Sequence, residues 1–486
     1  MIIKDLSTLR RFFKKIKFPI FGAGVYAFNR VGPEGFLDNY RILSLYHSKE
    51  TELIKKDLPV FCLEERIGKR LTPKNSSTLL SHPETQRYIQ KHCPGYPAVI
   101  LAYRSSKAIE RLAKRNRWRI AVAPYFFGKH LFENKIKFRK ILQKIGIPVP
   151  PGKVVSLPLK NSHFYYFKKE FGLPFVLQYP TKGGGKGTFF IRDEREFEKA
   201  REVLNSYFKD SKDKSFSQII VAEYIKGPSP SITGCVTKFG VLSTRPQYQI
   251  CDVSLLYSRE ATSGLFCGHD WSSSVFSKRI LSQAKQTVEK VGNYFKRFHY
   301  QGIFGLDFVL DKKEQRLYVT ECNPRLLGSF PTLTMIQLER GEPPIIGFHL
   351  LEYLGLPYDI DTKKINSQLW EKKEGAQMIL HSSFNKKAII QGELEAGVYQ
   401  GTYSKQGTTG LDFVRSGYNF SHLKSKKEFL FTEGLLKRNS LIQPYQRLVR
   451  IITKGKVLNE NLDDILPDTK SLIKLVFKKL NVKFLS

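Results

Sequence analysis

Residues Leu317–Pro331 read LYVTECNPRLLGSFP, an apolar run that leads directly into three polar side chains at alternate positions. Glu321, Asn323 and Arg325 are spaced by two, and a strand turns successive side chains to opposite faces. These three side chains therefore share one face if the segment is extended. A carboxylate, an amide and a guanidinium on one face predict a surface that binds a metal ion and an anion.

The expected partner strand precedes this segment, in GIFGLDFVLDKKEQRLYVTECNPR (302–325). Asp307 faces Glu321 across this hairpin if the connecting loop has five residues, 312–316. A four-residue loop, 312–315, places Asp307 on the opposite face unless a β-bulge intervenes. The alternative interpretation is that both acids are solvent-facing residues of an edge hairpin.

The sequence TKGGGKGT (181–188) lies between two predicted strands, FVLQ and TFFI. Glycines allow backbone N–H groups to approach an oxyanion closely, and lysines add positive charge. A Walker A loop is excluded because that motif ends in GK[ST] and is followed by a helix. We therefore predict a glycine lid over phosphates, with a simple flexible hairpin tip as the alternative.

The composition predicts a globular protein of several domains, because 486 residues with 41% hydrophobic content can bury a sizeable core. The six scattered cysteines form no CxxC pair, which argues against a zinc knuckle or a disulfide framework. No signal-peptide pattern opens the chain and no apolar run approaches the ~18 residues of a membrane span. We expect a cytoplasmic protein without a transmembrane segment.

The formal net charge of +36 admits three kinds of partner: nucleic acid, an acidic membrane surface or an anionic substrate. The basic residues are spread along the whole chain, and no nucleic-acid-binding motif accompanies them. A lysine-rich solvated surface is the favoured interpretation, so no specific nucleic-acid partner is expected. The basic, apolar-striped segment 471–486 is expected to form a helix that packs on its own domain.

Three regions follow from the pattern along the chain. Alternating apolar runs and polar stretches in 1–130 predict a parallel α/β domain, whose Gly22–Ala27 segment is a weak dinucleotide-like GxGxxA. The region 131–356 contains predicted helices at 135–145, 193–208 and 277–298, the first capped by Asn134 and the second beginning with the capping-box-like pair Asp193 and Glu196. A lid subdomain is expected at about 147–222, and 357–486 is expected to be a β-rich extension ending in a basic helix.

The order of these features resembles the ATP-grasp superfamily, and within it the biotin-carboxylase-like and carboxylate–amine ligase branch with a preceding α/β domain. That order is a lysine-rich helix capped by Asn134, a strand with the glycine lid, the strand of VAEYIKG, the acid Asp307, and then acid-x-Asn-Pro-Arg. The resemblance covers about 132–356. It implies an α/β ATP-grasp fold that holds a nucleotide between two sheets, with ATP and Mg²⁺ (or Mn²⁺) as cofactors.

The resemblance also implies roles for individual residues, carried over by position. Arg325 and Lys186 would act at the reacting phosphoryl group, and Asp307, Glu321 and Asn323 would bind the metal. The residues that would bind ATP are Lys135, Gln178, Lys182, Gly183, Gly184, Gly185, Lys186, Gly187, Glu223, Tyr224 and Ile225. The chain departs from the family at Gln178, where a second phosphate-binding lysine is usual, and at Ala222, where an acid is common.

Loops between the hinge strands and the helix 277–298 occupy the position where the family binds its substrates. Candidate substrate residues there are Arg245, Arg259, His269 and Asp270. A packed aromatic turn around Trp271 is the alternative for His269 and Asp270, and a surface ion pair is the alternative for Arg245.

The predicted function is an ATP-dependent ligase that activates a carboxylate as an acyl phosphate and joins it to an amine, expected to be an amino acid or small peptide. One alternative is a biotin-carboxylase-like or nucleotide-pathway enzyme that activates bicarbonate or another small acid. Another is a basic protein that binds ATP or nucleic acid without turnover. Small-molecule substrates are the expected partners, and the sequence says nothing of the oligomeric state.

Overall fold

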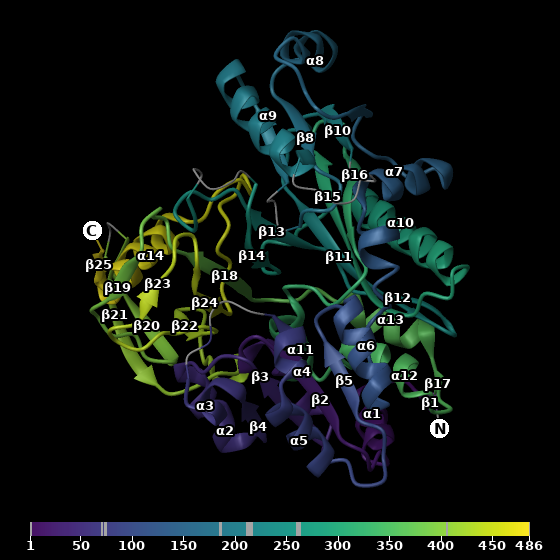
Figure 1. Ribbon diagram of the computed structural model, residues 1–486, viewed down its shortest axis with the longest axis vertical. Helices are drawn as coiled ribbons and strands as arrows, with labels where there is room; N and C mark the ends of the chain where they lie inside the picture. The colour runs from purple at the N-terminus through teal and green to yellow at the C-terminus, as the bar shows by residue number, and fades with distance from the viewer. Residues whose placement is uncertain are drawn as a thin grey trace.

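The computed structural model describes residues 2–69, 71, 75–183, 187–209, 217–258, 264–404 and 407–485. Figure 1 shows three regions: the N-terminal strands and helices at the bottom, a small helix-covered sheet at the top, and the C-terminal strands at the left. The five-stranded sheet and a two-stranded one are parallel, whereas the eleven-, four- and three-stranded sheets are antiparallel, so the predicted mixed α/β class is confirmed. Among the described residues, no helix is both long and apolar enough to cross a membrane.

The first region contains a five-stranded parallel sheet in the order β4-β3-β2-β5-β6. Its strands are apolar because helices cover both faces, as expected for parallel sheets. The elements are β1 (Ile2–Ile3), α1 (Leu6–Phe13), β2 (Ile20–Gly24), β3 (Tyr40–Ser44), α2 (Lys49–Asp57), β4 (Val60–Cys62), α3 (Leu63–Ile67), α4 (Ser76–Ser81), α5 (Pro83–Lys91), β5 (Val99–Ala102), α6 (Lys107–Asn116) and β6 (Arg119–Ile120).

The GxGxxA segment has a structural explanation in this sheet. A Cβ atom on Gly22 would lie 1.9 Å from the Tyr40 hydroxyl, so the glycine makes room for that side chain. A short 3₁₀ turn, Ala27–Arg30, follows β2. The pattern therefore lacks the helix N-terminus on which a dinucleotide pyrophosphate would sit.

The second region is a four-stranded antiparallel sheet, β7-β10-β8-β9, that carries the glycine lid between β8 and β9. Helix α7 begins at Lys135 because the Asn134 side chain accepts a hydrogen bond from the Lys137 N–H, as predicted. The elements are α7 (Lys135–Lys144), β7 (Gly152–Ser156), α8 (His163–Phe171), β8 (Phe175–Gln178), β9 (Thr188–Ile191), α9 (Glu194–Lys209) and β10 (Gln218–Glu223).

The largest sheet is antiparallel and runs β16-β15-β11-β13-β14-β18-β24-β22-β20-β21, with β12 paired to β11. The C-terminal strands therefore extend the same sheet that holds the 302–325 hairpin, through the β14–β18 pair. Its first part comprises β11 (Pro230–Thr237), β12 (Gly240–Ser243), β13 (Gln247–Cys251), β14 (Phe266–Asp270), α10 (Lys278–Lys296), β15 (Gly302–Asp311), β16 (Arg316–Asn323), α11 (Phe330–Glu339) and α12 (Ile345–Leu354).

The C-terminal region continues the large sheet from β18 onward. It comprises β17 (Asp359–Ile360), α13 (Thr362–Leu369), β18 (Ala376–His381), β19 (Ala388–Ile390), β20 (Gly397–Ser404), β21 (Gly407–Arg415), β22 (Glu428–Thr432), β23 (Leu441–Ile442), β24 (Arg447–Thr453), α14 (Pro467–Leu480) and β25 (Val482–Phe484). Helix α14 buries Leu472, Ile473, Val476 and Leu480. The predicted packing of this basic helix on its own region is confirmed, while Phe484 lies beyond it in β25 and is exposed.

Aromatic packing fixes the position of α7 relative to the large sheet. Phe132, three residues before Lys135, stacks on Phe295 of α10 with ring centroids 3.8 Å apart. Both rings are fully buried. Helix α10 begins after the capping residue Ser277, close to the predicted start.

We expect Phe295→Ala to lower the free energy of unfolding by about 3–5 kcal/mol, because a fully buried ring leaves a cavity. Phe298→Ala removes a ring that is 41% exposed and should cost about 1 kcal/mol or less. Urea unfolding of both variants measures the difference, and equal costs would contradict the assigned packing.

Candidate active site

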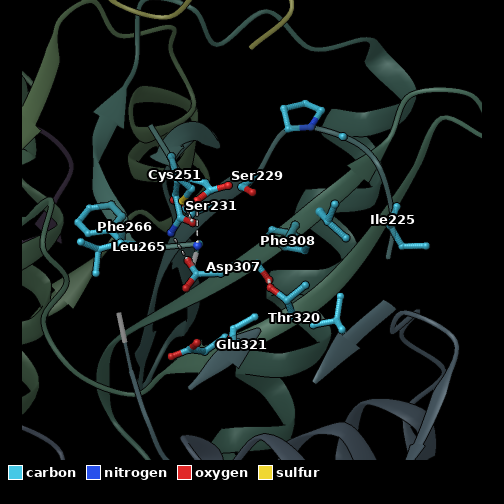
Figure 2. A pocket seen from close by; sticks show the side chains of 18 of the residues that line it. Ile225, Ser229, Ser231, Cys251, Leu265, Phe266, Asp307, Phe308, Thr320 and Glu321 are labelled. Carbon is cyan, nitrogen blue, oxygen red and sulfur yellow. Dashed lines mark hydrogen bonds between the residues drawn. The ribbon is translucent and has the colours of Figure 1, made fainter. Parts of the chain in front are cut away.

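A cavity of about 610 Å³ lies between the four-stranded sheet and the large sheet. Val176, Gln178 and Phe190 line it from the small sheet, and Asp307 and Glu321 line it from the hairpin. Figure 2 shows the two acids next to each other, with Ile225 toward one end of the cavity and Leu265 and Phe266 toward the other. The cavity thus brings together most of the chemistry that the sequence indicated.

The hairpin β15–β16 adopts the second of the two registers considered. Asp311 pairs with Arg316, which leaves a four-residue loop, and the register shifts between Asp307 and Phe308. The extra residue is Thr320, so Asp307 pairs with Glu321. The bulge therefore brings the two carboxylates to one face, which is the four-residue-loop alternative with a β-bulge.

Asp307 is a half-buried carboxylate whose hydrogen bonds, among the described residues, come from two neutral amides. Its two oxygens accept hydrogen bonds from the side-chain amides of Gln249, at 2.7 Å, and Asn323, at 2.8 Å. Burial and the neighbouring charge of Glu321 raise the pKa of Asp307 to about 7. Two close carboxylates and the second lone pair of the Asn323 amide oxygen form a set of oxygen donors that fits a divalent cation such as Mg²⁺.

Lys135 ties the start of α7 to this pair of acids. Its ammonium lies 3.0 Å from Glu321 Oε2 and donates to the Lys182 carbonyl at 2.9 Å. The Lys135 side chain is only 3% exposed. A buried lysine that touches both the metal-ligand face and the lid backbone is suitably placed to neutralise a phosphate.

Arg325 is held rigidly on the same face. Its Nε donates to Glu133 at 3.1 Å, its Nη1 to the Tyr103 hydroxyl at 2.5 Å, and its Nη2 to the Asn323 amide oxygen at 2.5 Å. Burial opposes its charge, but Tyr103 and Glu133 outweigh burial and raise the pKa of Arg325. The guanidinium is therefore a permanent, preorganised positive charge beside the acids.

The predicted phosphate-binding residues around the glycine-rich segment lie near the cavity where the structure describes them. Gln178 lines the cavity and lies 3.5 Å from the Thr188 hydroxyl. The Lys182 ammonium lies 4.3 Å from the centre of the Tyr207 ring, and Gly183 lies near the Arg325 guanidinium. A Cβ atom on Gly187 would lie 2.6 Å from Lys182 Cβ, so the glycine makes room for that side chain. Gly184, Gly185, Lys186 and Arg259 lie outside the described residues.

The predicted hinge follows the end of β10. Glu223, Tyr224 and Ile225 all line the cavity, as does the adjacent Ala222. The Tyr224 ring makes an edge contact with Phe190, with centroids 5.5 Å apart. The Glu223 N–H donates to the Pro151 carbonyl, and the apolar Val176 and Phe190 lie along the same cavity as this segment. Apolar side chains beside a backbone segment have the character of a site for a flat heterocycle.

The three described candidate substrate residues, Arg245, His269 and Asp270, do not all line the cavity. His269 lines the cavity. Asp270 is fully buried and accepts hydrogen bonds from the Val457 and Leu458 N–H groups, so it fastens the 457–458 loop instead of facing the cavity. The Arg245 N–H donates a hydrogen bond to the Leu369 carbonyl at 3.1 Å. Arg245 is not one of the described residues that line the cavity.

His269 is held in one neutral form. The Gln377 amide oxygen accepts from Thr332 and Arg450, so its nitrogen faces His269 Nδ1, 3.0 Å away. Nδ1 is therefore the acceptor, and the ring proton lies on Nε2. Burial and Arg450 lower the pKa of His269 to about 3.

Four further residues belong to the site: Tyr103, Glu133, Gln249 and Arg447. Tyr103, Gln249 and Arg447 line the cavity, and Glu133 pairs with Arg325. Glu133 directly precedes the capping residue Asn134, which is a weak local signal. The other three have no signal in the sequence, because they come from strands far apart in the chain.

Comparison with known proteins assigns the region around this cavity. Residues 132–329 match the family model described as the ATP-grasp domain. The chain contains an ATP-grasp domain. The match spans the lid, the hinge and the hairpin with Asp307, Glu321, Asn323 and Arg325, and thus confirms the resemblance drawn from the order of the motifs.

Relatives and solved structures agree with this assignment. The D-alanine–D-alanine ligase of Carboxydothermus hydrogenoformans is 28% identical over 197 residues, which cover 39% of this chain and 58% of the ligase. The matches to three other relatives cover 16%, 9% and 54% of those proteins. The chain therefore spans less than two thirds of the length of each of these four relatives. A biotin carboxylase complex from Campylobacter jejuni has a TM-score of 0.55 at 15% identity, covering 96% of this chain and 92% of the other.

A second solved structure extends the likeness over nearly the whole chain. The N5-carboxyaminoimidazole synthase of Aspergillus clavatus has a TM-score of 0.53 at 15% identity and covers 95% of this chain and 99% of its own. At this identity the likeness shows the fold, including the regions before and after the ATP-grasp domain.

The bulge can be tested directly. Deleting Thr320 removes the extra residue but leaves Glu321 opposite Asp307, because Val319 still pairs with Phe308. Mg²⁺–nucleotide binding should therefore stay within about 3-fold. Inserting a glycine after Lys313 changes only the loop and should also leave binding within about 3-fold. Isothermal titration with a nonhydrolysable ATP analogue measures both, and loss of binding in the deletion variant would contradict the bulged register.

The neutral His269 predicts a pH dependence of stability. Its pKa is lowered by folding, so the unfolded chain takes up a proton below about pH 6.5 while the native state stays neutral. Stability is therefore lost as the pH falls from about 6.5 toward 3, with a slope of about 1.4 kcal/mol per pH unit for this group.

Between pH 4 and 6, His269→Gln should reduce the measured slope of unfolding free energy by about that amount. His299→Asn changes an exposed histidine with a φ of 58°, a conformation that asparagine accepts, and should leave the slope unchanged. Urea unfolding at several pH values measures this effect. An unchanged slope in the His269 variant would show that this ring is protonated in the folded protein.

Proposed function

We propose that the protein is an ATP-dependent carboxylate–amine ligase, with ATP and Mg²⁺ bound in the 610 Å³ cavity. The observation that carries the proposal is the pairing of Asp307 with Glu321 beside Lys135 and Arg325. Two carboxylates, an ammonium and a guanidinium around one point are what a phosphoryl-transfer site requires. The matched ATP-grasp domain and its ligase relatives support the same function.

In this proposal the nucleotide would lie in the cavity between the two sheets, and the residues of the cavity wall suit its parts. Glu223, Tyr224 and Ile225 would hold the adenine edge through backbone groups, against the apolar Val176 and Phe190. Gln178, Lys182 and the glycine lid would contact the phosphate groups of ATP. Gln178 offers a hydrogen bond without charge, so Lys135 supplies the main positive charge of the described phosphate site.

The acids Asp307 and Glu321, with Asn323, would hold Mg²⁺, which shields the phosphate oxygens when bound. A substrate carboxylate oxygen attacks the γ-phosphorus of ATP, and the bond to the bridging oxygen of ADP breaks. Arg325 neutralises the developing charge on the transferred group because its position is already fixed by Glu133, Tyr103 and Asn323.

The product of the first step is an acyl phosphate. The amine nitrogen then attacks the carbonyl carbon, the bond from carbon to the phosphate oxygen breaks, phosphate leaves and the nitrogen loses a proton. A closed lid would keep water from the acyl phosphate. We propose that the enzyme has three domains. They are an N-terminal domain at 1–130, the ATP-grasp domain at 131–356 with its lid at about 147–222, and a C-terminal domain at 357–486.

The test is Mg²⁺-dependent formation of ADP from ATP, screened with pools of amino acids, short peptides, polyamines and bicarbonate. Glu321→Gln and Arg325→Ala should each lower the rate by about 100-fold or more, because each removes a charge used at the transferred phosphoryl group. Arg325→Ala should affect turnover more than nucleotide affinity.

Glu314→Gln is the matched control, since Glu314 lies in the exposed loop of the same hairpin and only accepts from the Tyr318 hydroxyl. It should leave the rate within about 2-fold. Stimulation by bicarbonate alone would favour a carboxylase. Full activity in Glu321→Gln would refute the assignment.

A further inference from the structure

The far end of the cavity contains an arginine that the phosphoryl-transfer step does not use. Arg447 begins β24 and lines the cavity together with Tyr103, His269 and Gly328. It comes from the C-terminal part of the large sheet, and Tyr103 comes from the N-terminal parallel sheet. Two regions of the chain therefore build this wall around the candidate phosphate site.

Arg447 shares one carboxylate with a second arginine. Glu433 is fully buried and pairs with both Arg447 and Arg450. Burial alone would raise the pKa of Glu433, but Arg450 and Arg447 outweigh burial and lower it to about 2. Two guanidiniums against one carboxylate leave a surplus of one positive charge in the wall, and a buried surplus charge favours an anionic ligand.

The two arginines differ in how fully their N–H groups are used. Arg450 is 2% exposed and donates to Glu433, the Gly328 carbonyl and Gln377. Arg447 is 39% exposed, and only its Nη1 donates, to Glu433. Among the described residues, its Nε and Nη2 have no acceptor. A guanidinium with two free donors at a cavity wall fits a carboxylate, which accepts two parallel hydrogen bonds.

Tyr103 connects this arginine to the reacting group. Its hydroxyl accepts from Arg325 Nη1 at 2.5 Å, and Tyr103 lines the same cavity as Arg447. Tyr103 directly follows β5, and its carbonyl accepts from the Leu326 N–H at 3.2 Å. The carboxyl ends of parallel strands are where α/β sheets bind ligands, so this edge is a suitable place for a substrate.

We propose that Arg447 binds the free carboxylate of the amine substrate, which makes that substrate an α-amino acid or the C-terminal residue of a short peptide. This inference rests on the proposed function, and it assigns a specificity-determining residue to the same cavity. With its carboxylate on Arg447 beside Tyr103, the substrate would direct its amino group toward the acyl group near Arg325.

The charges of the wall favour a carboxylate over a phosphate group. The surplus at Arg447, Arg450 and Glu433 is one positive charge, which balances a carboxylate but leaves a phosphate dianion in excess. Asp463 also lines the cavity. Its negative charge would repel a dianion and attract the ammonium group of an amino acid.

The experiment compares acids with their amides. The probes are the twenty L-α-amino acids and their matched carboxamides, titrated into the full chain with Mg²⁺ and a nonhydrolysable ATP analogue by ligand-observed NMR. At least one acid should bind, and its amide should bind about 30-fold or more weakly, because loss of one partner of a buried charge pair is costly. Arg447→Gln should weaken the acid to the level of its amide and leave the amide within 3-fold.

Two further variants keep the test decisive. Arg447→Lys retains the charge on Glu433 but loses the paired donors, and should weaken the acid by about 10-fold. Arg438→Gln changes an exposed arginine of the same region and should change nothing. The comparison of acid with amide in the unaltered protein needs no variant at all, so it decides the matter even if Arg447→Gln unfolds.

Several results would overturn the inference: equal binding of acids and amides, equal weakening of both by Arg447→Gln, no binding by any amino acid, or displacement by inorganic phosphate in preference to acetate. The proposed function is judged separately by ADP formation. If other amine pools drive ADP formation while no amino acid binds, the ligase stands and the role of Arg447 falls. If amino acids bind through Arg447 and no pool yields ADP, the ligase falls instead.

Discussion

The site depends on one electrostatic constraint, the placement of two carboxylates on one partly buried face. Asp307 and Glu321 face each other only because Thr320 is an extra residue in β16. Burial and the neighbouring charge of Glu321 raise the pKa of Asp307 to about 7, so this face favours added positive charge. Lys135 and Arg325, which adjoin it, supply part of that charge and belong to different elements.

The remaining elements position those cations. Asn134 starts α7 at Lys135, and the stack of Phe132 on Phe295 holds this start against the large sheet. Arg325 is fixed by Glu133 from the same turn and by Tyr103 from the N-terminal sheet. Packing and hydrogen bonds thus fix the positions of these charges before any ligand binds. A preorganised site of this kind needs little reorganisation when the ligand arrives.

The cavity has two ends with different chemistry. The hinge end is apolar and offers backbone groups, as a flat heterocycle requires. The other end is lined by Arg447, Tyr103 and His269, and buried networks through Glu433 and Gln377 fix its side chains. The acids and Arg325 lie between the two ends, so ligands bound at both would meet at the candidate phosphoryl-transfer point.

The sequence by itself determined the class of fold, the capped helices, the lid between two strands and the face shared by Glu321, Asn323 and Arg325, because each rests on local periodicity or on motif order. Only the tertiary structure decided the bulge at Thr320, the burial of Asp270 at the end of β14, and the positions of Gln249, Tyr103 and Arg447 at the cavity. Register depends on cross-strand pairing, and convergence depends on which distant strands become neighbours. Neither is encoded in the spacing of residues along one segment.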